Sequence, residues 1–165
     1  MTINVRFVAD TMLGKLAKWL RLMGFDVSYH CQATAVQLLY RAGGEDRILL
    51  TRDHSLIACG DSAQRFYVES DYYHLQVRQV VQAFDLTRSI QAFTRCSRCN
   101  TPLVAISKRA VVTKVPAYVY ATQTSFKHCL PCDHVYWGGT HRANMIRQLR
   151  VMLRDVHPSI ADLLR

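Results

Sequence analysis

Two Cys-x-x-Cys pairs constrain the fold of this 165-residue chain more than any other feature of its sequence. Cys96 pairs in this way with Cys99, and Cys129 with Cys132, with 29 residues between the two pairs. Each pair can place two thiolates on one tight turn, and two such turns supply the four soft ligands of a tetrahedral site. We therefore expect a structural Zn²⁺ ion in the C-terminal half of the chain.

Two disulfides are the main alternative to a zinc site, and they require an oxidising compartment. The first ten residues contain no basic segment followed by an apolar segment and a cleavage site, so we expect no export and a cytoplasmic protein. A redox role is a second alternative, but a redox pair usually occurs alone near a β-α-β pattern. The doubled motif favours zinc.

Other cysteine and histidine side chains are expected to lie outside this site. Cys31 and Cys59 have apolar surroundings in the sequence and are expected in the core. His128 and His134 flank the second pair, and either could replace a cysteine as a ligand. Because four cysteines are available, we expect both histidines to lie beside the site or in solvent.

The net charge of +9 is concentrated in the second half of the chain. Residues 1–93 carry 10 Lys or Arg against 9 Asp or Glu, whereas residues 94–165 carry 11 against 3. This excess predicts a polyanionic partner, most simply nucleic acid, with a solubilising surface as the alternative. No apolar run approaches the roughly 20 residues that cross a bilayer, so no membrane partner is expected. We divide the chain into a domain of residues 1–93 and a smaller module of residues 94–165.

Short apolar segments alternate with amphipathic segments through the first half. The predicted strands span residues 5–9, 25–30, 47–51 and 66–69. Helices are predicted between Thr11 and Gly24 and over residues 34–42, 55–59 and 73–84. This alternation with short turns predicts an α/β fold in which a parallel sheet is flanked by helices.

The first predicted helix has one apolar face and one basic face. Thr11 is its expected N-cap, and Gly24 ends it. The apolar face is formed by Leu13, Leu16, Ala17 and Leu20. The basic face is formed by Lys15, Lys18 and Arg21. We expect the basic face to be solvated, and to bind phosphate if the fold turns it toward a site.

Carboxylates follow three of the predicted strands. Asp10 follows the first strand, Asp53 the third, and Glu69 or Asp71 the fourth. Ligands of open α/β sheets bind outside the carboxyl ends of the strands, where clustered acids need a cation to stay ionised together. Mg²⁺ or Mn²⁺ prefers such oxygen ligands and can orient a water against a phosphodiester. The pattern predicts a metal-dependent hydrolase of nucleic acid, with helix capping as the alternative for each Asp.

Three segments together resemble one known family. They are Val8-Ala-Asp10 with the helix up to Asp26, Ile48-Leu-Leu-Thr-Arg-Asp53, and the two cysteine motifs with the segment up to His141. In this order they resemble the Mut-seven-type C-terminal ribonuclease domain, a PIN-like nuclease fused to a zinc ribbon. The resemblance implies a PIN-like sheet, endonucleolytic cleavage of RNA that depends on Mg²⁺ or Mn²⁺, and a zinc ribbon that helps to hold the substrate. Candidate partners are single-stranded or structured RNA, including tRNA or the ribosome.

The resemblance also assigns catalytic residues. Asp10 and Asp53 match the acids that bind the catalytic metal, and Asp71 is the preferred third acid, with Glu69 as a weaker candidate. PIN-like nucleases usually carry another acid on the helix before the third strand, but residues 34–44 contain none. Glu45 and Asp46 come only after that helix, so either one of them substitutes or the metal site has fewer acids.

The second half is predicted to form a zinc ribbon and a C-terminal helix. Ribbon strands are expected at residues 111–115 and 117–121, on either side of Pro116. The final helix is expected to begin at the N-cap Thr140. Its predicted core face is Met145, Ile146, Leu149 and Leu153.

Basic and aromatic residues of this half suit single-stranded RNA, because charges bind phosphates and rings stack on bases. Of Tyr118, Tyr120 and Phe126 we expect one to contact bases, since aromatic residues in strands more often lie in the core. The predicted RNA-binding residues of the whole chain are Lys15, Lys18, Arg21, Arg52, Lys108, Arg109, Lys114, Lys127, His141, Arg142, Arg147 and Arg150.

Two other functions remain open on the sequence. One is an RNA-binding or ribosome-associated zinc protein with a vestigial nuclease site. The strand-end carboxylates that would form this site, Asp10, Asp53 and Glu69 or Asp71, are called the acidic edge below. The other is a toxin-like PIN protein that cleaves one specific RNA.

Overall fold

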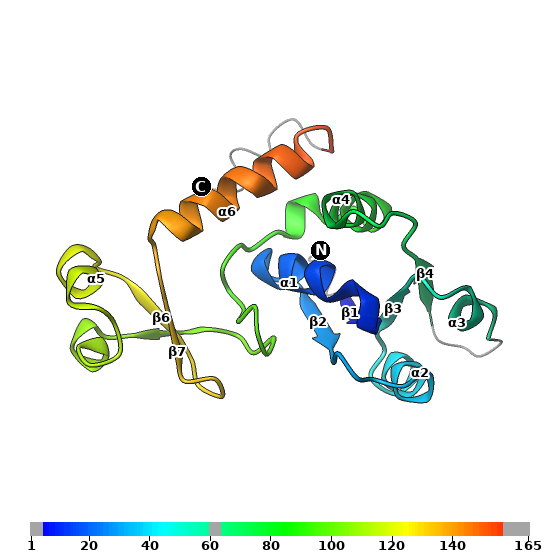
Figure 1. Cartoon of the computed structure of the whole chain (residues 1–165), viewed down its shortest axis with the longest axis horizontal. Helices are drawn as coiled ribbons and strands as arrows, with labels where there is room; N and C mark the ends of the chain where they lie inside the picture. The colour runs from blue at the N-terminus through cyan, green and yellow to red at the C-terminus, as the bar shows by residue number, and fades with distance from the viewer. Residues whose placement is uncertain (1–4, 60–63, 157–165) are drawn as a thin grey trace.

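The structure is a computed structural model that describes residues 5–59 and 64–156. Its first half contains a parallel four-stranded sheet with the strand order β2-β1-β3-β4 (Figure 1). The strands are β1 (Arg6–Ala9), β2 (Asp26–Tyr29), β3 (Ile48–Thr51) and β4 (Arg65–Tyr67). The predicted α/β fold with a parallel sheet is confirmed, and β1 and β3 lie side by side.

Helices cover both faces of this sheet. One face packs on η1 (Thr11–Leu13), α1 (Gly14–Leu22) and α4 (Tyr73–Ala83), and the other on α2 (Ala35–Gly44) and α3 (His54–Ala58). Successive side chains of a strand point to opposite faces. Phe7 and Ala9 accordingly join the larger core under α1 and α4, whereas Val8 joins the smaller core under α2 and α3.

The first helix buries the face that its sequence predicts. Its four apolar residues are fully buried: Leu13, Leu16, Ala17 and Leu20. Gly24 has a φ of 97°, and a Cβ there would lie 2.4 Å from the carbonyl oxygen of Gln91, so only glycine suits this helix end. The predicted N-cap is wrong by one residue. The N-cap is Asp10, whose side chain accepts a hydrogen bond from the backbone amide of Thr11.

A three-stranded antiparallel sheet in the order β5-β6-β7 carries the cysteine motifs. Its strands are β5 (Val104–Ile106), β6 (Phe126–Cys129) and β7 (His134–Trp137). We call residues 94–139, which contain this sheet, the cysteine module. Its strands β6 and β7 and the segment between β5 and β6 lie on the left of Figure 1, beside the sheet domain.

The strands predicted at residues 111–115 and 117–121 are wrong. The chain instead forms η3 (Lys108–Val111) and α5 (Ala117–Thr122), and Pro116 occupies the N-cap of α5. Val111, Val115 and Val119 all join the module's core, Val111 from η3, Val119 from α5 and Val115 from the turn between them, so their β-branched side chains were misleading as a sign of strands. A further short helix, η2 (Thr87–Ser89), precedes the module.

The C-terminal helix α6 (Thr140–Leu153) returns from the cysteine module to the first half (Figure 1). Leu149, Met152 and Leu153 are buried in the core that α1 and α4 share. Helix α6 therefore packs with the sheet domain, although the predicted division assigns it to the module of residues 94–165. That division stays a prediction. The helix cap is Gly139 and not Thr140.

Cys31 and Cys59 are exposed, so their predicted place in the core is wrong. Both follow the end of an element, Cys31 in the turn after β2 and Cys59 at the C-cap of α3, where the chain leaves the core. Among the described helices, none has both the length and the apolar character needed to cross a membrane.

Candidate functional site

The four cysteines of the two motifs converge on one point. Their sulfur atoms all lie within 4.8 Å of one another. The Sγ atoms of Cys96 and Cys132 are 3.9 Å apart, and those of Cys99 and Cys129 are 3.3 Å apart. Zinc bonds of about 2.3 Å in a tetrahedron place sulfurs about 3.8 Å apart, whereas a disulfide needs about 2.05 Å. All four thiols are free, and together they could hold a zinc ion.

The ionisation of these thiols is coupled through their proximity. Burial raises the pKa of Cys99, but hydrogen bonds with Thr101 and the neighbouring thiols outweigh it and lower the pKa to about 6. Burial raises the pKa of Cys129, and contact with the neighbouring thiols, Cys99 first, raises the pKa of Cys132. One thiolate therefore opposes the formation of others, and a divalent cation removes this conflict.

The two flanking histidines lie outside the group of four, as expected. The Nε2 atom of His128 lies 2.8 Å from a carboxylate oxygen of Asp133, which is also paired with Lys114. His134 is exposed, and its ring meets that of Tyr136 edge to face. The hydroxyl of Tyr136 in turn lies 3.1 Å from the sulfur of Cys96.

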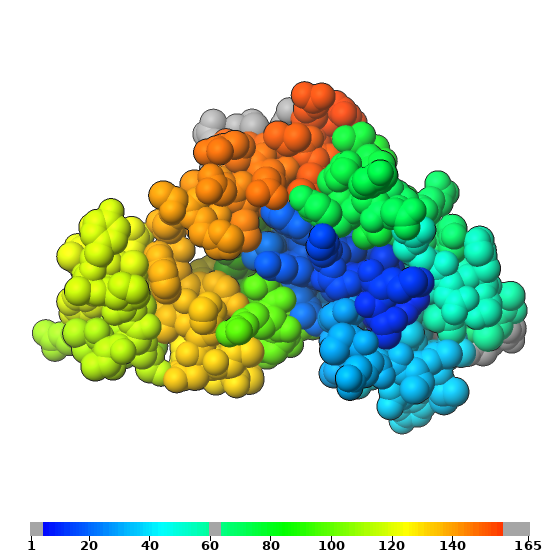
Figure 2. Space-filling model, viewed as in Figure 1, coloured from blue at the N-terminus to red at the C-terminus, as the bar shows by residue number. Residues whose placement is uncertain are grey.

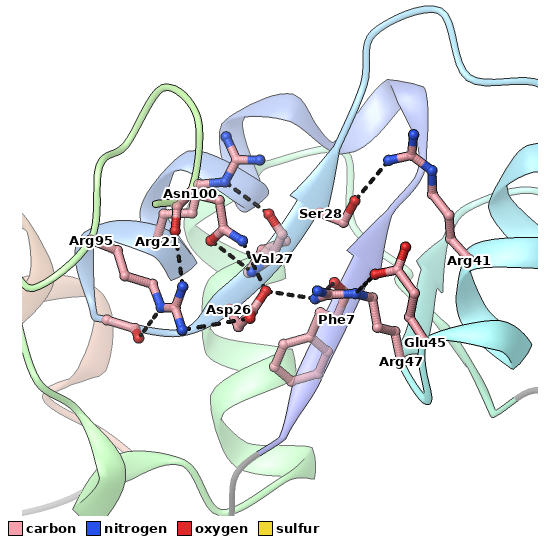
Figure 3. Close-up of polar contacts among 11 residues, drawn as sticks. Phe7, Arg21, Asp26, Val27, Ser28, Arg41, Glu45, Arg47, Arg95 and Asn100 are labelled. Carbon is pink, nitrogen blue, oxygen red and sulfur yellow. Dashed lines mark hydrogen bonds and ion pairs between the residues drawn. The ribbon is translucent and has the colours of Figure 1, made fainter. Parts of the chain in front are cut away.

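The turn of residues 96–100, here called the first cysteine turn, is hydrogen-bonded directly to the parallel sheet (Figure 3). The side chain of Asn100 donates to Asp26 over 2.8 Å and accepts from the backbone amide of Val27 over 3.0 Å. Arg21 donates to the carbonyl oxygen of Val27 over 2.9 Å and to that of Arg98 over 2.8 Å. Arg21 is buried by these contacts, so its predicted place on an exposed phosphate-binding face is wrong.

Asp26 is the charged centre of this junction, and sequence reasoning missed its role. Its carboxylate lies 2.6 Å from Arg47 and 3.5 Å from Arg95 (Figure 3). Burial alone raises the pKa of Asp26, but hydrogen bonds from Arg47 and Asn100 outweigh it, so the pKa is lowered. An acid directly after Gly24 and Phe25, outside any catalytic pattern, is the only signal in the sequence.

The acidic edge lies where the strand order reverses, between β1 and β3. Asp10 follows β1 and is buried, and its Oδ2 atom accepts a hydrogen bond of 2.7 Å from the hydroxyl of Thr51. The same hydroxyl accepts a hydrogen bond of 3.0 Å from the backbone amide of Asp53. One threonine at the end of β3 thus contacts the carboxylate of Asp10 and the backbone of Asp53. Open α/β sheets bind ligands at such a reversal point.

Asp53 is exposed and caps α3. Its carboxylate accepts a hydrogen bond of 2.8 Å from the backbone amide of Ser55. Hydrogen bonds with Ser55, from side chain and backbone, lower the pKa of Asp53. Asp10 and Asp53 therefore both cap helices, as helix capping, the alternative role of each acid, predicts.

The other predicted acids differ in position. Asp71 follows β4 and is paired with Arg52, and the exposed Glu69 lies nearby in the chain. Glu45 and Asp46 precede β3 and so lie at the opposite edge of the parallel sheet, where neither can substitute for a missing acid. In the described part of the chain, the cysteines are the only group of three or more His, Cys, Asp or Glu whose ligand atoms lie within 4.8 Å.

The predicted RNA-binding side chains fall into two groups. Several have partners within the protein: Arg52 with Asp71, Lys108 over the ring of Tyr120, Lys114 with Asp133, and Lys127 with the carbonyl oxygen of Phe93. Others are exposed: Lys15, Lys18, Arg109, His141, Arg142, Arg147 and Arg150. Three of these also have partners within the protein: Lys15 lies over the ring of Tyr73, Arg142 lies over that of Phe93, and Arg150 has a contact of its own. Tyr118 is 77% exposed, whereas Phe126 is buried in the module's core and cannot stack on a base.

Comparison with known proteins identifies the family of this chain. No curated protein and no solved structure shows significant similarity to it. The family model described as the Mut7-C RNAse domain matches residues 5–149, which include the acidic edge and all four clustered cysteines. An RNase domain points to a nuclease, with RNA as its substrate. The chain belongs to the Mut7-C RNAse domain family.

Proposed function

We propose that this protein is a divalent-metal-dependent ribonuclease that hydrolyses RNA phosphodiesters endonucleolytically at the acidic edge. The single observation that carries the proposal is the pairing of Asp10 and Asp53 through Thr51, at the reversal point of the parallel sheet. Membership in the Mut7-C RNAse domain family supports it. The PIN-like identity of the sheet domain, residues 1–93, is part of the same proposal.

Asp10 and Asp53 would hold the catalytic ion. Their carboxylate oxygens fit Mg²⁺ or Mn²⁺, and Mg²⁺ is commonly bound through one or two carboxylates with several retained waters. Such an ion supplies an activated water and neutralises charge that develops on the phosphodiester. Thr51 orients Asp10, and the amide of Ser55 keeps Asp53 ionised.

Asp71 and Arg52 extend this edge. Their side chains are paired, and Arg52 directly precedes Asp53 in the chain. When RNA binds, Arg52 can exchange this carboxylate for a phosphate, because both accept the guanidinium fork. Asp71 would then be free to face the metal as a third acid.

Zinc in the cysteine module would be structural. Four thiolates leave no open position for a reactive water, which is the pattern of structural zinc sites. The ion would fix the two cysteine turns, one of which is bonded to the sheet through Asn100. The basic surface of residues 94–165 would help to bind the substrate.

The test is cleavage of single-stranded RNA with Mn²⁺ or Mg²⁺ by purified full-length protein. Wild type and the exposed-acid control Asp85→Asn are expected to cut, whereas the double variant Asp10→Asn, Asp53→Asn is expected to lose at least about 100-fold in rate. All three are purified identically, so that a contaminating nuclease would appear in each. Equal cleavage by all three, or none by any, overturns the proposal.

The second candidate is an RNA-binding zinc protein with a vestigial acidic edge. It is favoured by one observation, that no three acids within the described residues come as close together as the four cysteines do. If wild type and the double variant bind RNA equally and both leave it intact, this second function holds.

A further inference from the structure

A cleft of about 740 Å³ separates helix α1 from the cysteine module. Its walls come from α1, the first cysteine turn, β6, β7 and the start of α6. Figure 2 shows a hollow on this face, between the blue α1 and the orange segment of β7 and α6. The cleft is distinct from the acidic edge, because neither Asp10, Asp53 nor Asp71 lines it.

The charge of this cleft is all of one sign. Five of the described lining residues are Lys or Arg, two are His, and none is Asp or Glu. Lys18 and Arg98 are exposed, and within the described residues neither side chain has a carboxylate partner. Such a surface attracts a polyanion and not a neutral or cationic ligand.

The start of α6 adds to this field. Gly139, Thr140 and His141 line the cleft, and Gly139 caps the helix without a side-chain hydrogen bond. The first turn of this 14-residue helix contains no acid. Its free backbone amides therefore add positive potential to that of the basic side chains.

Aromatic rings in the same walls favour unpaired bases over a duplex. Phe93, Tyr136 and Trp137 line the cleft, and the guanidinium of Arg142 lies 4.9 Å from the centre of the Phe93 ring. A splayed base can stack on a ring or on a guanidinium plane, while its phosphate is held by a neighbouring charge. A paired base would not expose its face to such rings.

Helix α1 joins this cleft to the acidic edge. Asp10 lies directly before η1 and α1, and Lys18 follows it by eight residues on the exposed side of the helix. At a rise of 1.5 Å per residue the two are roughly 12 Å apart along the axis. A stacked strand advances about 3.4 Å per nucleotide, so about four nucleotides cover this distance.

We propose that the cleft between α1, the cysteine module and the start of α6 binds a segment of single-stranded RNA and feeds it along α1 to the acidic edge. Lys18, Arg98 and Arg142 hold its phosphates, and Trp137 stacks on a base. The part of this inference that leads the RNA to the acidic edge rests on the ribonuclease function proposed above. The binding of RNA in the cleft does not require cleavage.

Binding is measured by anisotropy of a fluorescent oligouridylate of about twelve nucleotides, a length within known single-strand site sizes. The full-length, zinc-loaded protein carries Asp10→Asn, so that the RNA stays intact. Adding Lys18→Gln and Arg98→Gln should weaken binding about tenfold and flatten the slope of log K against log salt by about 1.4, because a single strand contributes about 0.7 per phosphate contact. The matched control is Arg88→Gln with Arg154→Gln, which removes two exposed charges outside the cleft.

A second readout follows Trp137 directly. Trp19→Phe leaves Trp137 as the chain's only tryptophan. Its emission should change as RNA binds and saturate at the same RNA concentration as the anisotropy. An unchanged emission during binding, or equal losses in the cleft variant and the control, overturns the inference.

The two proposals fail separately. If the cleft variant loses binding as expected but wild type never cuts RNA, the binding site stands and the ribonuclease function falls. If wild type cuts RNA and the cleft variant binds and cuts as the control does, the ribonuclease function stands and the cleft inference falls.

Discussion

The guanidinium of Arg21 in α1 donates a hydrogen bond of 2.8 Å to the backbone carbonyl oxygen of Arg98, between the first two clustered cysteines. It also donates to the carbonyl oxygen of Val27 near the start of β2, so one side chain links helix, sheet and cysteine turn. Burial lowers the pKa of Arg21, whereas the nearby thiols of Cys99 and Cys96 oppose this change. A zinc-thiolate centre would therefore favour the charged guanidinium at this junction.

Arg21→Met should lower the free energy of unfolding by roughly 2 to 3 kcal/mol, because it leaves the buried carbonyl group of Val27 and the partly buried one of Arg98 without this donor. Lys18→Met, three residues earlier on the exposed side of the same helix, is the matched control and should change stability little. Urea unfolding followed by circular dichroism measures both. Equal midpoints for the two variants would show that Arg21 does not hold the junction together.

Cys96→Ser should reduce bound zinc from one ion per chain to almost none and loosen the cysteine module, because metal binding supplies much of the folding free energy of such sites. Cys59→Ser, at an exposed cysteine outside the cluster, should retain full zinc. Metal content by colorimetric release and limited proteolysis between β5 and β6 provide the readouts. Zinc retained by Cys96→Ser would exclude the four-thiolate site.

The regular elements of the first half could be predicted from the sequence, because local patterns encode them. Each predicted strand and helix appears within a few residues of its expected bounds, and the apolar face of α1 is buried as its spacing indicates. The convergence of the cysteines was also predictable, since two tight turns with two thiols each have few other stable arrangements.

The junction between the two halves could not be predicted, because its bonds join residues far apart in the chain through backbone groups. Arg21 and Lys18 are both basic and belong to the same predicted face of the helix, yet Arg21 is buried and Lys18 is exposed. Asn100 has a φ of 75°, a conformation that asparagine tolerates well, and only the folded turn shows that its side chain reaches β2. The positions of Asp10 and Asp53 at strand ends could be predicted from the alternation of strands and helices. Their shared hydrogen-bond partner Thr51 could not, because it depends on β1 and β3 being neighbours in the sheet.

Asp26→Asn should destabilise the protein at neutral pH by about 2 kcal/mol, because charged hydrogen bonds to arginine are lost. The folded-state pKa of Asp26 is lowered, so its contribution is present above the unfolded pKa near 4 and is lost as the pH falls through the lower folded value. The difference between wild type and Asp26→Asn should therefore shrink below about pH 4. Asp85→Asn, at an exposed turn, is the control. A difference that is constant with pH would contradict this role.

Thr51 lies fully buried between the two acids, and its hydroxyl can be removed without changing its shape. If the protein is a ribonuclease, Thr51→Val should reduce kcat about 10- to 100-fold and raise the Mn²⁺ concentration needed for half-maximal rate, because a group that orients a metal ligand is lost. KM for RNA should change little, since no substrate contact is removed. Thr51→Ser keeps the hydroxyl and should restore most of the rate, whereas Thr87→Val, at another buried threonine, should leave the rate and the Mn²⁺ requirement unchanged. A Thr51→Val variant with the metal requirement of wild type would mean that Asp10 is held in place without this hydroxyl.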